Sequence, residues 1–146
     1  MKYELIKSSI NDLDRLVEYK KNIIYEYAHD LGRDEIEEIE KYVLESVPKL
    51  LNDYYNIVVK NRVVGALLVT NRKGAKELDE IYLEEEYRNK GIGTSIIKDI
   101  IHNNLVYLWV YKDNLKAISL YQKLGFKIVD ETNTRYYMKY ESGVNV

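Results

Sequence analysis

A stretch near the middle of the chain, EYRNKGIGTSII (residues 86–97), combines basic residues with glycines at the start of a predicted helix. Arg88 and Lys90 flank the approach to Gly91 and Gly93. The first backbone N–H groups of a helix have no intrahelical partner, and the helix dipole favours negative charge there. Glycine lets the backbone approach an anion closely. The stretch therefore predicts a cradle for a phosphate group.

Two common phosphate loops are excluded by the residues that follow these glycines. A Walker loop needs a lysine and then Ser or Thr after its last glycine, but Gly93 is followed directly by Thr94. The dinucleotide fingerprint needs a third glycine at the position of Ile96. What remains is Arg88-x-x-Gly91-x-Gly93, which by itself is also compatible with an ordinary loop that opens a helix.

A second motif follows about two dozen residues later, N-x-x-A-x-x-L-Y-x-x-L-G-F. Its residues are Asn114, Ala117, Leu120, Tyr121, Leu124, Gly125 and Phe126. Together with EYRNKGIG, in this order and spacing, it resembles the GNAT superfamily of N-acetyltransferases over roughly residues 55–140. The resemblance implies an acyl-CoA N-acyltransferase fold and transfer of an acetyl group from acetyl-CoA to a primary amine.

The resemblance also implies where acetyl-CoA would lie. The family binds it in a V between two strands, here residues 76–83 and 105–111. Its pyrophosphate would contact the backbone amides of residues 88–94, and its pantetheine arm would pair with the first of these strands. The amide of Leu83 would hold the thioester oxygen. The expected cofactor-binding residues are Ile81, Tyr82, Leu83, Arg88, Asn89, Lys90, Gly91, Ile92, Gly93, Thr94, Asn114, Ala117 and Tyr121.

The expected reaction is direct attack of an amine on the thioester, because the chain has no cysteine to carry an acyl group. An alkylammonium, with a pKa of roughly 10, must first lose a proton. Tyr121 falls at the position of the family's general acid, which protonates the leaving thiolate. Asp79 and Glu80 lie where the family often places a carboxylate base that acts directly or through water. Neighbouring strand residues face opposite sides, so we expect only one to reach the amine and favour Glu80; alternatively, both belong to a solvated acidic surface.

The amine acceptor is not identified by the sequence. In this fold the two N-terminal helices wall the acceptor site, here about residues 25–40. Their acids would favour a cationic acceptor, such as a polyamine, an aminoglycoside-like compound or a protein amine, or would form only a solvated helix face. The acids are Asp30, Asp34, Glu35, Glu37 and Glu38. Tyr25, Tyr27, Tyr107 and Tyr111 would line a pocket or belong to the core, and Trp109 is expected to pack inside its strand.

The elements that must position these residues follow from periodicity. Helical spacing predicts a helix from residue 11 or 12 to about 29, and a second that begins at Asp34 with a capping box to Glu37 and ends near Pro48. Further helices are predicted at residues 91–103 and 114–124. Strands are predicted at residues 3–7, 55–59, 62–70, 76–83, 105–111, 126–130 and 135–140. In the strand 76–83, Leu78, Glu80 and Tyr82 are expected on one face, opposite Asp79, Ile81 and Leu83.

This order, β-α-α-β-β-β-α-β-α-β-β, predicts an α/β domain with a mixed, mostly antiparallel twisted sheet of about seven strands flanked by helices. We expect one domain over residues 1–141, with residues 142–146 as a tail. The net charge of −2 gives no general attraction to nucleic acid. No apolar run approaches the roughly 18 residues of a membrane span. We expect a cytoplasmic, metal-free protein, a monomer or homodimer, with a non-catalytic acyl-CoA-binding sensor as the alternative function.

Overall fold

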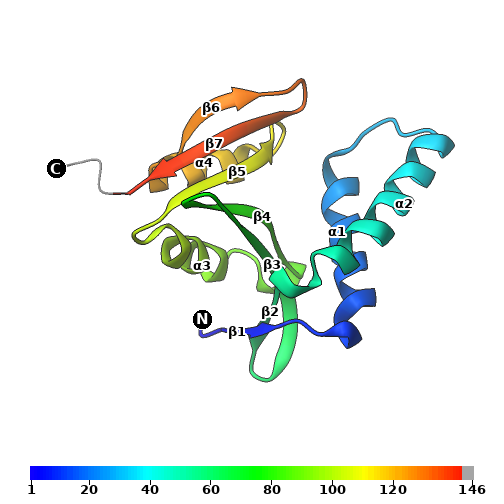
Figure 1. Ribbon diagram of the computed structural model, residues 1–146, viewed down its shortest axis with the longest axis horizontal. Coiled ribbons are helices and arrows are strands. Elements are labelled where there is room, and N and C mark those ends of the chain that lie inside the picture. Colours follow the sequence, from blue (N-terminus) through cyan, green and yellow to red (C-terminus); the bar gives the residue numbers. More distant parts are fainter. Residues whose placement is uncertain (143–146) are drawn as a thin grey trace.

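The computed structural model describes residues 1–142 and shows a seven-stranded sheet with helices on both faces (Figure 1). Its strands are β1 (Glu4–Lys7), β2 (Tyr54–Val59), β3 (Arg62–Arg72), β4 (Ala75–Leu83), β5 (Leu105–Tyr111), β6 (Lys127–Glu131) and β7 (Arg135–Glu141). Its helices are α1 (Leu13–Tyr27), α2 (Arg33–Lys49), α3 (Ile92–Ile101) and α4 (Leu115–Leu124). The predicted element order is confirmed. Of the predicted tail, residues 143–146 lie outside the described part.

The sheet has the strand order β1-β2-β3-β4-β5-β7-β6, and β4 with β5 is its parallel pair among antiparallel neighbours. These two strands are paired only from Lys76↔Val106 to Leu78↔Leu108. Beyond Leu78 they separate, while β4 continues to pair with β3 as far as Leu83. The expected V between the two strands is therefore present.

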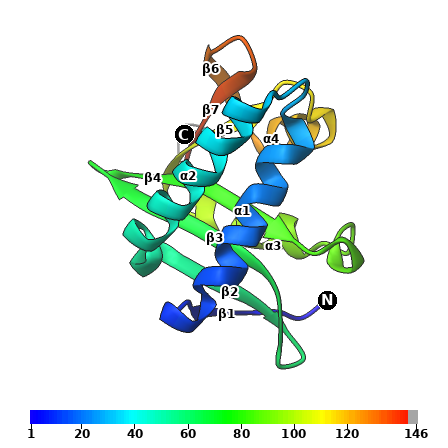
Figure 2. The same cartoon turned by 90° about the vertical axis from the view of Figure 1, so that its right-hand side faces the viewer.

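Two apolar cores lie on the two faces of the sheet. Helices α1 and α2 pack together on one face (Figure 2), with Leu16, Val43 and Val47 fully buried against Tyr54 and Leu68 of the sheet. Helices α3 and α4 belong to the other, larger core. Its buried members include Ile92, Ile96, Ile97, Leu108, Ile118, Tyr121, Phe126 and Met138. Among residues 1–142, no helix is both long enough and apolar enough to cross a membrane.

A bulge in β4 changes which face its residues take. Leu68 pairs with Glu80 but Val69 pairs with Leu78, so Asp79 is the extra residue. Leu78 consequently belongs to the α3/α4 core with Ile81, whereas Glu80 contacts Tyr54 on the α1/α2 face. The prediction that Leu78 shares a face with Glu80 is wrong, because strict alternation does not hold across a bulge.

Strand β5 is buried on one face only. Val106, Leu108 and Val110 are buried, but Trp109 between them is 37% exposed. The expectation that Trp109 packs inside its strand is wrong. Apolar aromatic residues on the second face gave β5 the composition of a buried strand.

The turn between β2 and β3 and the ends of α2 follow from local residue chemistry. Lys60 and Asn61 both have positive φ between β2 and β3, as a two-residue hairpin requires. Helix α2 ends one residue after Pro48. It begins earlier than predicted, because the amide of Gly32, not Asp34, pairs with a carboxylate three residues on, that of Glu35 (3.2 Å).

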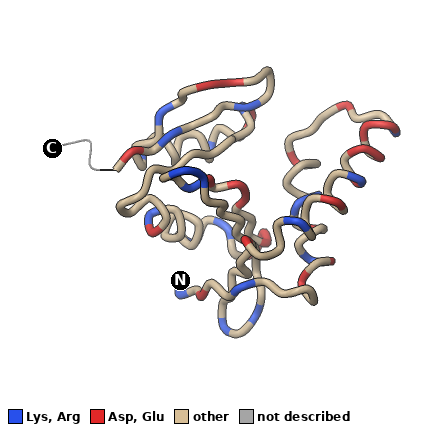
Figure 3. The backbone as a smooth tube through the Cα atoms, viewed as in Figure 1, with Lys and Arg blue, Asp and Glu red and all other residues tan. Residues whose placement is uncertain are grey.

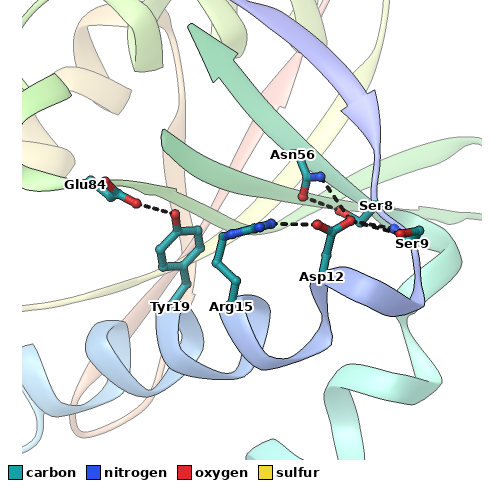
Figure 4. Close-up of polar contacts among 7 residues, drawn as sticks. All are labelled: Ser8, Ser9, Asp12, Arg15, Tyr19, Asn56 and Glu84. Atoms are coloured by element: carbon teal, nitrogen blue, oxygen red, sulfur yellow. Dashed lines mark hydrogen bonds and ion pairs between the residues drawn. The ribbon is translucent and has the colours of Figure 1, made fainter. Parts of the chain in front are cut away.

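A polar junction fixes the start of α1 against the sheet (Figure 4). The Asp12 carboxylate accepts hydrogen bonds from the Ser9 amide (2.7 Å), from Arg15 (2.6 Å) and from the Asn56 side chain of β2 (3.1 Å). Burial opposes ionisation of Asp12, but these donors outweigh it and hold its pKa below the usual range. Further along α1, the Tyr19 hydroxyl donates to Glu84 just after β4 (2.6 Å). The contacts of Asp12 and of Tyr19 together orient α1 over the sheet.

We expect Asp12→Asn to lower the free energy of unfolding by about 1–3 kcal/mol at pH 7, because buried donors lose a charged acceptor. A carboxylate whose pKa is lowered by folding stabilises the protein above its unfolded pKa of about 3.9, and this is lost as pH falls through the folded pKa. The difference between variant and parent should therefore shrink below about pH 4. Urea unfolding at pH 7 and pH 3 measures it. Asp14→Asn, an exposed change of equal charge on the same helix, should show no comparable difference.

Candidate active site

Two clefts open beside the point where β4 and β5 separate. The first, of about 640 Å³, is lined by the end of β4, the start of α3 and α4; we call it the cradle cleft. The second, of about 550 Å³, is lined by Asp79, Glu80, residues of β5 and residues of α1; we call it the carboxylate cleft. Both are bordered by Ile23, Tyr27, Ile81, Asn114 and Tyr121. The two clefts therefore meet at Tyr121.

The floor of the cradle cleft is the backbone that leads into α3. Asn89 and Gly91 have positive φ (60° and 84°), which turns the chain sharply before the helix. The Ser95 amide bonds to the Gly91 carbonyl (3.0 Å) as the first turn closes. The amides that precede Ser95 in this turn have no intrahelical acceptor. This is the geometry that the glycine pattern predicted for an anion cradle.

Gly93 tests whether the cradle fits a ligand. A Cβ placed there would lie 4.0 Å from the Ile81 and Leu83 side chains, which is ordinary contact distance, and its φ is not positive. The protein itself therefore has room for alanine at this position, yet Gly93 borders the cleft. A methyl group would fill cradle space that a phosphate could occupy. The residues present thus fit the pyrophosphate that the sequence motif predicts.

Arg88 borders the cradle cleft and also makes contacts within the protein. Its Nε donates to the carbonyl of Leu83 (2.7 Å), and its guanidinium lies 5.4 Å from the centre of the Tyr82 ring and 3.9 Å from Glu26. These contacts direct the guanidinium to the end of β4. The Glu26 carboxylate partly neutralises the charge of Arg88.

Other predicted cradle residues divide between backbone and side-chain roles. The Ile92 side chain is buried in the core, which leaves only its amide for a ligand. Lys90 is exposed and is not among the residues that border either cleft. Lys116 of α4 does border the cradle cleft, and its Nζ contacts the Asn89 side chain. The sequence prediction missed Lys116, although it lies inside the second motif, two residues after Asn114.

The end of β4 presents free backbone groups to the V. The Glu84 amide donates to Val64 of β3 (2.8 Å). Because amides alternate in direction along a strand, the amides of Leu83 and Ile81 point the other way, toward the side without a paired strand. The Leu83 carbonyl on that side is the acceptor for Arg88. Leu83 N–H is thus directed as an oxyanion donor in the cleft would be.

Tyr121 and Asn114 come from α4, which the second motif encodes. The Asn114 side chain caps this helix by accepting from the Ala117 amide (3.2 Å). Tyr121 is buried, and burial together with the neighbouring Tyr27 hydroxyl raises the pKa of Tyr121 to about 12. Among the described residues its hydroxyl has no hydrogen-bond partner. A neutral, unengaged phenol at the junction of two clefts can donate a proton.

The two predicted carboxylates both border the carboxylate cleft. Glu80 is buried; its Oε1 accepts from the Tyr54 hydroxyl (2.9 Å) and lies 3.5 Å from Lys20 Nζ, while its Oε2 is without a partner in the described chain. Burial raises the pKa of Glu80, and Lys20 opposes that shift. Asp79 accepts a hydrogen bond from the Thr70 hydroxyl (2.6 Å) and is exposed to solvent. Loss of hydration around the carboxylate, together with the neighbouring Glu77, nevertheless raises the pKa of Asp79 to about 6. The hydrogen bond from Thr70 acts in the opposite direction.

Aromatic residues form the walls of the carboxylate cleft. Of the four candidate tyrosines, Tyr27 and Tyr111 border the cleft. Their rings stack with centres 5.2 Å apart. Trp109 also borders the cleft. The ring centres of Trp109 and Tyr137 are 4.5 Å apart, and the Arg135 guanidinium lies 4.9 Å from the centre of the Trp109 ring. Sequence reasoning missed Lys20, Tyr42 and Arg135, because nothing local marks them as cleft residues.

Most of the acidic residues of α2 lie in its N-terminal half (Figure 3). Asp34, Glu35, Glu37 and Glu38 are exposed and do not border either cleft. They agree with the alternative expectation of a solvated helix face. From the two N-terminal helices, the cleft walls are instead made by Lys20, Ile23, Ile24, Tyr27 and Tyr42, joined at the cradle by Glu26.

The sequence profile of the acetyltransferase (GNAT) family matches residues 18–126. The chain belongs to this family. The predicted resemblance is confirmed and extends further toward the N-terminus than residue 55. The chain resembles the spermine/spermidine N(1)-acetyltransferase of Bacillus subtilis, with 32% identity over 42% of this chain and 45% of that protein. It therefore matches less than half the length of that relative.

Two comparisons with Thermoplasma acidophilum proteins cover nearly the whole chain. A spermidine N(1)-acetyltransferase is 29% identical over 97% of this chain and 100% of that protein. The structure of PaiA N-acetyltransferase in complex with coenzyme A has a TM-score of 0.73 and 26% identity, over 97% of this chain and 99% of that one. The predicted GNAT fold is confirmed, and acetyl-CoA is the donor that the family uses.

We expect Gly93→Ala to weaken coenzyme A binding about tenfold or more while leaving the fold intact, because the methyl group enters the cradle but meets the protein only at contact distance. Alanine also favours a helix over glycine by roughly 0.5–1 kcal/mol, so thermal stability without ligand should not fall. Calorimetric titration with coenzyme A and thermal unfolding measure both effects. Ser95→Ala, on the same turn but away from the cleft lining, is the control. Unchanged affinity in Gly93→Ala would contradict a close approach of the ligand to this backbone.

Proposed function

We propose that this GNAT-family chain transfers the acetyl group of acetyl-CoA to a primary amine of a polyamine. The observation that carries the proposal is the meeting of the cradle cleft and the carboxylate cleft at Tyr121. One cleft offers backbone amides and free strand groups suited to acetyl-CoA. The other offers one buried and one exposed carboxylate with aromatic walls, suited to an alkylammonium.

The donor side is assigned to the backbone between β4 and α3. Amides of residues 89–94 would hold the pyrophosphate, with Lys116 as a nearby cation. The unpaired edge of β4 would bind the pantetheine arm, and Leu83 N–H would stabilise negative charge on the thioester oxygen. Ala117 and Asn114 border the same cleft.

The acceptor side is assigned to Glu80 as base and Tyr121 as acid. Glu80, through Oε2 or a water, takes a proton from the acceptor ammonium, and the neutral nitrogen then forms a bond to the acetyl carbon. The carbon–sulfur bond breaks, and the Tyr121 hydroxyl gives its proton to the departing thiolate. The second proton that the nitrogen sheds as the amide forms restores the phenol, and Glu80 releases the first proton to solvent. The raised pKa of Tyr121 keeps the phenol protonated at neutral pH, as a proton donor must be.

Asp79 is the competing candidate for the base. Its pKa of about 6 is close to the value that suits proton abstraction at neutral pH. Glu80 is favoured because it is more deeply buried and has an oxygen without a partner, which a bound ammonium or water would satisfy. The relatives from Bacillus and Thermoplasma are named for acetylation of spermine or spermidine, which supports a polyamine as acceptor.

A non-catalytic acyl-CoA sensor would need the cradle cleft but neither Tyr121 nor the carboxylates. We expect acetyl-CoA to raise the melting temperature and spermidine to release free coenzyme A, measured with a thiol reagent. Tyr121→Phe should keep the thermal shift and lose about 10²–10⁴-fold in kcat, the usual contribution of a general acid. Tyr140→Phe, a change outside both clefts, is the control. Cofactor binding without turnover on polyamines, aminoglycosides, amino acids or peptides would favour the sensor.

The choice between the two carboxylates is tested by Glu80→Gln and Asp79→Asn. We expect the first to reduce kcat with spermidine about 10²-fold or more near pH 7 and the second to reduce it much less. The Glu80→Gln defect should shrink toward pH 10, where the free amine no longer needs a base. Steady-state rates from pH 6 to 10 measure this. The reverse ranking would assign the base to Asp79.

A further inference from the structure

Lys20 occupies an unusual place for a lysine. It projects from α1 into the carboxylate cleft, where only 13% of its side chain is exposed. Its Nζ lies 3.5 Å from Glu80 Oε1 and 5.7 Å from the centre of the Tyr42 ring of α2. Lysine is almost never buried unless its charge is paired. The Glu80 carboxylate and the Tyr42 ring are the groups that pair it here.

The charged and titratable groups around Glu80 come from four elements. Lys20 comes from α1, Tyr42 from α2, Tyr54 from β2 and Asp79 from β4 itself. Burial and the Asp79 charge raise the pKa of Glu80, whereas Lys20 and the Tyr54 hydroxyl lower it. Lys20 is the cation among these four groups. The ionised state of this buried carboxylate therefore depends on Lys20.

The contacts of the two carboxylate oxygens differ. Oε1 is held by Tyr54 and faces Lys20, and Oε2 has no partner in the part of the chain that the structure describes. We propose that Lys20 is a positioning residue for the transfer reaction: it keeps Glu80 ionised and engages Oε1, so that Oε2 receives the proton of the acceptor amine. This inference rests on the assignment of Glu80 as base in the proposed function.

A titration tests the inference without any turnover. The carbon-13 carboxyl resonance of Glu80, identified by its loss in Glu80→Gln, is followed with pH in the parent protein and in variants. We expect its midpoint to move to higher pH in Lys20→Met and to stay close to the parent value in Lys20→Arg. Lys21→Met removes the same charge one residue away, where Lys21 pairs with Glu40 (2.6 Å), and should leave the midpoint in place. An unmoved midpoint in Lys20→Met overturns the inference.

The pH profile of kcat with spermidine gives the second readout. Lys20→Met should lose about tenfold or more at pH 6 but much less at pH 9, because a protonated Glu80 regains its charge as pH rises. A loss of equal size at both pH values would indicate a packing role and contradict the inference. If the parent protein itself shows no turnover, the proposed function fails, while the titration still decides whether Lys20 controls Glu80.

A double variant covers the case in which Lys20→Met does not fold. Removing one partner of a buried ion pair is strongly destabilising, because the other charge is left unpaired. If Lys20 acts through Glu80, the combination of Lys20→Met with Glu80→Gln should restore folding that the single change loses. A double variant as unstable as the single one would assign Lys20 to packing and overturn the inference.

Discussion

The separation of β4 from β5 after three paired residues is the constraint on which the rest of the site depends. Backbone N–H and C=O groups inside a sheet are normally paired, and leaving them unpaired away from water is costly. Here β4 keeps β3 on one side while its other edge, near Ile81 and Leu83, opens into a cleft. Arg88 satisfies the Leu83 carbonyl at this edge. The remaining edge is accessible to an extended ligand, and α3 starts close by with its free amides. A strand edge and a helix start are thus brought to the same cleft by one interruption of pairing.

The bulge at Asp79 has a second consequence, for charge. It follows directly on the last residue paired with β5, and it turns Leu78 to one core and Glu80 to the other. A carboxylate is thereby placed among the buried residues beneath α1 and α2, where an isolated charge would be neutralised by protonation. Tyr54 and Lys20 stabilise the charge of Glu80 through contacts with only one of its oxygens, Oε1. Tyr121 lies in the opposite core, where burial raises its pKa and keeps its phenol protonated. The two faces of one sheet thus bring a buried carboxylate and a protonated phenol to the walls of the same cleft.

The sequence predicts those features of the structure that depend on residues close together in the chain. The element order and the sharp turn at the glycines before α3 follow from contacts within a few residues. What escaped prediction depends on contacts between distant segments. The phase of β4 depends on a bulge against β3, and the guanidinium of Arg88 lies beside Glu26 of α1. No local signal marks Lys20 as a cleft residue, because its partner Glu80 lies 60 residues further along the chain, on the sheet.

Helix α1 connects these features physically. Its first turn is fixed to β2 through Asp12 and Asn56, and Tyr19 fixes it to Glu84, between β4 and the cradle. The residues that follow on the same helix, Lys20, Ile23 and Tyr27, reach the clefts. A rotation of α1 would therefore displace Lys20 from Glu80 and Tyr27 from Tyr121 together. Because the anchors and the cleft residues share one rigid helix, the pairing of Lys20 with Glu80 and the surroundings of Tyr121 are determined by the same contacts that stabilise the fold.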